Sequence, residues 1–103
     1  MNIKVREGKF EVIDSFAIRR KNEFYLIGEL IEGKVQENWF INVPFNKSLS
    51  MTVRISAIED VEISSEENKY KLLLVSCDNE TIDFLLGLKI GSEYLDITIE
   101  GED

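Results

Sequence analysis

The stretch GELIEGKV, at residues 28–35, comes close to the nucleotide-binding pattern G-x-x-x-x-G-K-[ST]. Gly28, Gly33 and Lys34 fit this pattern, whereas Val35 stands where a serine or threonine would bind magnesium. A working loop of this kind lies between a strand and a helix and wraps phosphate with backbone N–H groups. Residues 29–32 instead continue a strand, and a turn and another strand follow them. The stretch therefore predicts two structural glycines and no nucleotide site.

Other residue types that carry chemistry are few. The chain has one cysteine, Cys77, and no histidine, so a cysteine nucleophile would lack its usual base. Cys77 follows an apolar run, which indicates a small core residue at a strand end. Glu59, Asp60 and Glu62 lack the spacing of a calcium-binding loop and favour a solvated acidic edge. We therefore predict no catalytic, cofactor-binding or metal-binding residues, and no enzyme.

Charge limits the classes of partner. The chain has 103 residues, with 20 acidic and 12 basic side chains and a net charge of −8. This charge repels nucleic acids and anionic membranes, whose binding depends on lysine and arginine, and it would attract a basic protein. Alternatively, the excess of acidic side chains could serve only to keep the chain soluble. The length predicts a single domain over residues 1–103, and the first residues lack the apolar segment of a signal peptide, so we expect a cytoplasmic protein.

Apolar residues recur mainly with a period of two, which is typical of strands. Asp14-Ser15 and Ile58 each indicate a bulge, and residues 78–86 could form a short helical turn that ends at Gly87. The expected strands cover residues 10–18, 24–31, 39–43, 51–63, 70–75 and 94–99, before an acidic tail at 100–103. This pattern predicts an all-β fold with a single six-stranded antiparallel barrel of Greek-key type, because closure leaves no exposed sheet edge.

The glycine stretch also belongs to a longer pattern. The apolar strand at 10–18, a turn and then GELIEGKV resemble the opening of the second domain of elongation factor Tu and related translational GTPases. Residues 53–59, residues 72–75 and the glycines before the last strand resemble later parts of that domain in the same order, so the resemblance covers about residues 8–99. It implies a β-barrel with structural glycines at Gly28, Gly33, Gly87 and Gly91.

Three features depart from that family. Glu37-Asn38 stands where the family usually has Gly-Asp, and Arg20-Lys21-Asn22 occupies a hairpin turn that often contains glycine in the family. The GTPase domain that normally precedes the barrel is absent from this sequence. The barrel stays the expected fold. The Glu37-Asn38 departure is compatible with it, because asparagine also tolerates a left-handed turn.

In translation factors this barrel is an accessory module that packs on the GTPase domain and helps contact RNA. The resemblance therefore implies a non-enzymatic binding module, and we expect a protein partner. Two alternatives stay open: an acidic inhibitor or immunity-type protein that neutralises a basic toxin or nuclease, and a ribosome- or RNA-associated factor, which the charge opposes. An outward Trp39 or Phe40 near Tyr25 would form an exposed aromatic patch, which would indicate a partner surface. The expected contact residues are Arg19, Arg20, Lys21, Tyr25 and Trp39.

Overall fold

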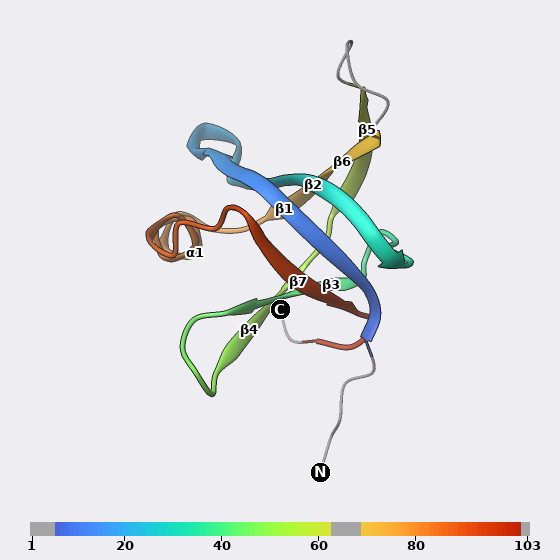
Figure 1. Cartoon of the computed structure of the whole chain (residues 1–103). Helices are drawn as coiled ribbons and strands as arrows, with labels where there is room; N and C mark the ends of the chain where they lie inside the picture. Colours follow the sequence, from blue (N-terminus) through green and yellow to red (C-terminus); the bar gives the residue numbers. More distant parts are fainter. Residues whose placement is uncertain (1–5, 63–68, 102–103) are drawn as a thin grey trace.

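The chain folds into a curled antiparallel sheet with a short helix at one end, as a computed structural model shows (Figure 1). The structure describes residues 6–62 and 69–101. These residues form seven strands, a 3-10 turn and one α-helix. The elements are β1 (Arg6–Ile18), η1 (Arg19–Lys21), β2 (Glu23–Gly33), β3 (Phe40–Pro44), β4 (Ser50–Arg54), β5 (Ala57–Glu62), β6 (Lys69–Ser76), α1 (Asn79–Gly87) and β7 (Glu93–Thr98).

The strand order explains why the sheet curls. In the described residues the order is β4-β3-β7-β1-β2-β6-β5, so the consecutive strands β4 and β5 lie at the two edges. Only Ile55 and Ser56 separate β4 from β5, and the backbone N–H groups of these two residues form hydrogen bonds with segments near opposite edges of the sheet. The Ile55 N–H donates to Trp39 O at 2.8 Å, and the Ser56 N–H donates to Leu74 O at 2.7 Å. The two edges of the sheet therefore meet at this corner.

The predicted all-β antiparallel fold is confirmed, but the closed six-stranded barrel is wrong in strand number and in closure. The alternation over residues 51–63 predicts one strand with a bulge at Ile58, whereas the chain turns a corner at Ile55-Ser56 and forms β4 and β5. The period-two alternation of side chains is the same before and after such a corner. The sequence pattern therefore does not reveal that the chain pairs with β3 before the corner and with β6 after it. In the described residues no strand pairing joins β4 to β5 or to β6, and the barrel is open.

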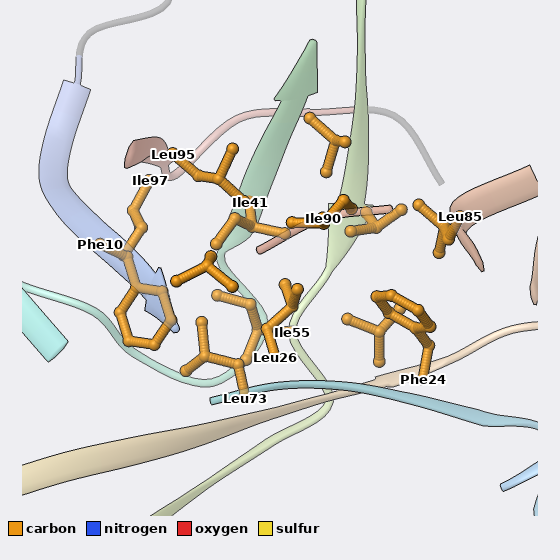
Figure 2. Packing of buried hydrophobic residues seen from close by; sticks show 14 residues of the cluster. Phe10, Phe24, Leu26, Ile41, Ile55, Leu73, Leu85, Ile90, Leu95 and Ile97 are labelled. Atoms are coloured by element: carbon orange, nitrogen blue, oxygen red, sulfur yellow. The ribbon is translucent and has the colours of Figure 1, made fainter. Parts of the chain in front are cut away.

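Fourteen buried apolar side chains fill the inside of the curled sheet (Figure 2). They come from all strands except β5, together with α1, the corner between β4 and β5, and the segment between α1 and β7. Full burial of one such side chain stabilises a fold by about 1.5–3 kcal/mol. The members are Phe10, Val12, Phe24, Leu26, Ile41, Val43, Val53, Ile55, Leu73, Val75, Leu85, Ile90, Leu95 and Ile97.

The stretch GELIEGKV is part of β2 and of the chain that follows it, as the sequence predicts. Gly28 faces Val12 of β1 across the ladder, and a Cβ at Gly28 would overlap the carbonyl oxygen of Glu11. Gly33 has a φ of 70°, in the left-handed region, and a Cβ there would overlap Glu7 O. Both glycines therefore allow a close approach of two backbones that a side chain would prevent.

β1 is bent along its length. Its register with β2 shifts between Lys9 and Phe10 and again between Val12 and Asp14. The second shift places a bulge at Ile13, directly before the predicted position at Asp14-Ser15. Bulges of this kind increase the local twist, and they help a sheet of this size to curl.

The C-terminal end of the chain differs from the prediction. The strand expected over residues 94–99 ends at Thr98, whose hydroxyl donates to Glu100 O at 2.7 Å, and Ile99 beyond this end is half-exposed. Gly101 then packs so closely on the Phe40 ring that a Cβ would overlap it. The expected acidic tail is thus held against β3 as far as Gly101. The rest of that tail and the polar loop expected at 64–69, except Lys69 at the start of β6, lie outside the described residues.

Helix α1 forms where the sequence predicts a helical turn. The Asp78 carboxylate caps the helix by accepting the Thr81 N–H at 2.8 Å, and Ile82 and Leu85 point into the core. The chain leaves the helix through Lys89, whose φ is 53°, so the left-handed residue lies two positions after Gly87. A Cβ at Gly87 would meet no atom within 4 Å, and one at Gly91 would make an ordinary contact at 3.7 Å from Ile13 O.

Candidate functional site

The predicted basic cluster lies on an exposed turn. Arg19, Arg20 and Lys21 form η1, and Asn22 closes the turn with a φ of 54° while its N–H donates to Arg19 O at 3.0 Å. Arg19 also pairs with Asp83 of α1, with 2.6 Å between Nη2 and Oδ1. Both side chains are more than half exposed, so the pair contributes little to stability. Its effect is to link the turn to the helix.

Tyr25 does not form an open contact surface, because Phe16 covers it. The two rings stack nearly parallel, with 4.8 Å between their centroids, and Tyr25 retains only 7% of its exposure. The Tyr25 hydroxyl donates to the Glu23 carboxylate, and this hydrogen bond, with burial and the Glu23 charge, raises the pKa of Tyr25. The exposed ring of this pair is therefore that of Phe16.

Trp39 lies at the other end of the sheet. It is half-buried, packs against the core and directly precedes β3. The first residue of β3, Phe40, pairs with Thr98, which in turn pairs with Arg6 at the start of β1, whereas η1 follows the end of β1. The structure thus brings Arg19, Arg20 and Lys21 together, leaves Trp39 at the far end of the sheet, and places Tyr25 near the turn but beneath the Phe16 ring.

A different group of side chains gathers beside α1. Phe45, Leu49 and Phe84 are 38%, 55% and 45% exposed, and we call these three residues the apolar rim. Phe45 and Phe84 contact each other edge to face, with 5.7 Å between the ring centroids. In Figure 1, α1 lies between the turn of β1 and β2 and the hairpin of β3 and β4. Two elements far apart in sequence therefore contribute to one apolar surface.

The loop that carries two residues of the apolar rim is ordered by its own hydrogen bonds. The Asn46 side-chain oxygen accepts the N–H groups of Ser48 and Leu49, at 2.9 and 2.8 Å. The Phe45 N–H also donates to Leu49 O at 3.1 Å. Side-chain turns of this type fix a short loop, so Phe45 and Leu49 are presented in a defined position.

A groove runs beside β4 where the sheet fails to close. We call it the β4 groove; its volume is about 650 Å³. All five residues of β4 line it on one side, and Val75–Asp78, at the end of β6, line it on the other. Val53 and Val75 are buried and belong to the core, and Phe45 of the apolar rim also borders the groove. The groove therefore joins an apolar floor to an apolar rim.

The electrostatics of the β4 groove are set by Asp78 and Arg54. A hydrogen bond from the Thr81 N–H lowers the pKa of Asp78, so this carboxylate is ionised at neutral pH. Arg54 turns toward β3, because its guanidinium donates to Asn38 O at 3.0 Å and lies 4.6 Å from the centroid of the Phe40 ring. The negative charge of Asp78 therefore stays accessible at the groove.

Cys77 also lines the β4 groove. It is half-buried at the end of β6, close to the predicted core position. Burial raises the pKa of the Cys77 thiol, and the neighbouring Asp78 charge raises it further. Because the thiolate is the nucleophilic form of cysteine, this environment disfavours a nucleophilic role for Cys77.

Within residues 6–62 and 69–101, no group of three or more cysteine or acidic side chains is placed to hold a metal ion. In the same part of the chain, no helix has the length and apolar character needed to cross a bilayer.

No protein-family model matches this chain, and no curated protein or solved structure matches it either. The resemblance to the second domain of elongation factor Tu therefore stays a prediction. The functional proposal rests on the fold, on the apolar rim and on the β4 groove.

The residues of the apolar rim are not among the predicted contact residues, although the sequence contains a signal for them. Phe45 follows the strand-ending Pro44, and Leu49 lies between two serines, so both are large apolar residues in a polar loop. Apolar residues that fall outside the period-two pattern are the sequence feature that could have identified this surface.

Proposed function

We propose that this protein is a non-enzymatic module that binds another protein, and that the partner presents a basic surface. The observation that carries the proposal is the apolar rim beside a groove that holds an ionised carboxylate. Single exposed apolar residues are common, but a grouped set framed by polar residues is typical of a docking surface. The net charge of −8 would steer a basic partner toward it.

The resemblance to the elongation factor Tu barrel forms part of the same proposal. The close backbone approaches at Gly28 and Gly33 agree with the roles that the resemblance implies for these residues. In translation factors this barrel is an accessory binding domain, which fits a module without chemistry of its own. We expect the protein to act in the cytoplasm.

An acidic inhibitor of a basic toxin or nuclease is a specific form of this proposal. The ribosome- or RNA-associated alternative is supported by one observation of its own. Phe16 exposes a flat ring stacked on Tyr25, three residues before the basic turn begins, and such a ring can stack on a base. The charge opposes this alternative, because RNA binding depends on neutralised phosphates.

Affinity capture from a lysate of the source cells tests the proposal, at low and high salt and with and without ribonuclease. We expect one basic protein that is retained at low salt and released at high salt, since exposed charges are screened. Phe84→Ser should reduce its recovery, whereas Phe16→Ser, a matched change of an exposed aromatic residue, should not.

The opposite pattern would contradict the proposal. Recovery of RNA or ribosomal proteins that ribonuclease removes, with a loss in Phe16→Ser and none in Phe84→Ser, would establish the RNA-associated alternative. Inhibition of the activity of a captured toxin or nuclease would identify the inhibitor form.

A further inference from the structure

We propose that the β4 groove holds an extended segment of the partner in which basic and apolar side chains alternate. This inference rests on the proposed function and specifies its binding mode. It identifies the occupant by chemistry, as about five residues of a basic protein chain, because five residues of an extended strand match the length of β4.

The shape of the groove favours an extended occupant over a helix. The groove follows the whole of β4, from Ser50 to Arg54, and its other wall is the short run Val75–Asp78. Both walls leave the corner at Ile55-Ser56, where the edges of the sheet meet. An extended chain presents a row of residues to each side along its length, so it can contact all five residues of β4 and the opposite wall together.

The distribution of apolar and charged groups favours an alternating sequence. Successive side chains of an extended segment point in opposite directions. Those that point into the groove would meet the floor at Val53 and Val75 and the ring of Phe45. Those that point outward would lie near the ionised Asp78 at the mouth of the groove. Apolar residues inward and lysine or arginine outward satisfy both environments.

Charge complementarity separates this occupant from its competitors. A second copy of the chain would bring a further charge of −8 to the groove, which disfavours self-association. The cation inside the groove, Arg54, is engaged with Asn38 and the Phe40 ring on the β3 side. Arg54 still lines the groove and keeps its charge, so the preference for a basic segment comes from the exposed Asp78 carboxylate and from the net charge of the whole chain.

A labelled synthetic peptide with alternating lysine and valine tests the inference by fluorescence anisotropy. The controls are a glutamate–valine peptide and a lysine–serine peptide of equal length. We expect the lysine–valine peptide to bind the full chain more tightly than either control. The inference is overturned if the peptide does not bind, or if the lysine–serine or glutamate–valine peptide binds equally well.

Matched variants locate the binding. Asp78→Asn removes the charge and keeps an N-cap residue, and it should weaken binding of the lysine–valine peptide about threefold, the size expected for one exposed ion pair. Asp14→Asn is the control, because Asp14 likewise accepts a backbone N–H at 2.8 Å but lies on β1. Phe84→Ser removes the ring that packs edge to face on Phe45, which borders the groove, and it should weaken binding about tenfold, whereas Phe16→Ser should leave binding unchanged.

Urea unfolding first confirms that each variant folds. Equal affinities of Asp78→Asn and Asp14→Asn, together with equal affinities of the two phenylalanine variants, would overturn the groove as the site.

The outcomes that overturn the proposed function differ from those that overturn the groove assignment. If lysate capture recovers a basic protein equally with wild type, Asp78→Asn and Phe84→Ser, a protein partner exists and the groove assignment falls. If the peptide maps to the groove and capture recovers no basic protein, the groove assignment stands and the proposed function falls.

Discussion

The contact of β1 with β2 and the contact of β4 with β6 lie in the same sheet, yet they differ in how closely the chains approach. Around Gly28 and Gly33 the backbones are so close that a single added carbon would overlap a carbonyl oxygen. Between β4 and β6 the chains part and leave the β4 groove. In the first region the backbones of β1 and β2 pair with each other and their apolar side chains fill the core. In the second region apolar and charged side chains line a groove where a partner could contact them. We infer that stability resides mainly in the β1–β2 region and partner binding in the β4–β6 region.

The largest expected effect comes from filling the close approach between β1 and β2. Gly28→Ala should lower the free energy of unfolding by about 3 kcal/mol, because the new Cβ meets Glu11 backbone and the Phe10 ring, neither of which has room to move. Gly87→Ala is the matched control. Its Cβ enters open space at the end of α1, and the change should raise stability by about 0.5 kcal/mol or leave it unchanged.

Urea denaturation of the two alanine variants measures this difference. Equal unfolding free energies for Gly28→Ala and Gly87→Ala would show that the close approach is not a steric requirement. That result would remove the contrast between the two regions.

A smaller effect is expected at the other region, from the charge of Asp78. The pKa of Asp78 lies below its ordinary value of 3.8, because the carboxylate accepts the Thr81 N–H. A carboxyl group with a lowered folded pKa contributes stability that is present above its unfolded pKa and is lost as pH falls through its folded pKa. Wild type should therefore exceed Asp78→Asn in stability at neutral pH, and the difference should vanish in strong acid.

Urea midpoints of both proteins at neutral and at strongly acidic pH measure this dependence. Asp14→Asn serves as the control for acid effects elsewhere in the chain. A difference between wild type and Asp78→Asn that stays constant over the whole pH range would contradict the assigned hydrogen bond.

The sequence predicted the local elements well and their assembly less well. Period-two alternation located the strands, the polar pair Asp14-Ser15 indicated the bulge, and residues 78–86 with Gly87 indicated the helical turn, because each of these features depends on neighbours in the chain. The corner at Ile55-Ser56 escaped prediction, since it depends on Trp39 and Leu74, which bond to these two residues from opposite sides. The corner divides the strand expected over residues 51–63 into β4 and β5, so the sheet has seven strands and these two strands form its open edges.

The candidate site was harder to predict because burial depends on distant residues. Tyr25 follows the inward Phe24, so alternation places it on the outer face, where exposure is expected. Phe16, on the neighbouring strand, covers it instead. The apolar rim combines Phe84 of α1 with Phe45 and Leu49 of a loop about forty residues earlier. Only the folded chain shows that these residues share a surface.

The central claim is that the partner contacts the β4 groove, and chemical-shift mapping tests it most directly. The backbone amide signals of the isotope-labelled protein would be followed while the lysine–valine peptide is added. We predict that the signals that move belong to Ser50–Arg54 and Ser76–Thr81, while those of Gly28 and Gly33 stay in place. Shifts confined to Arg19–Lys21 and the outer face of β1 would contradict the account and identify the basic turn as the binding site.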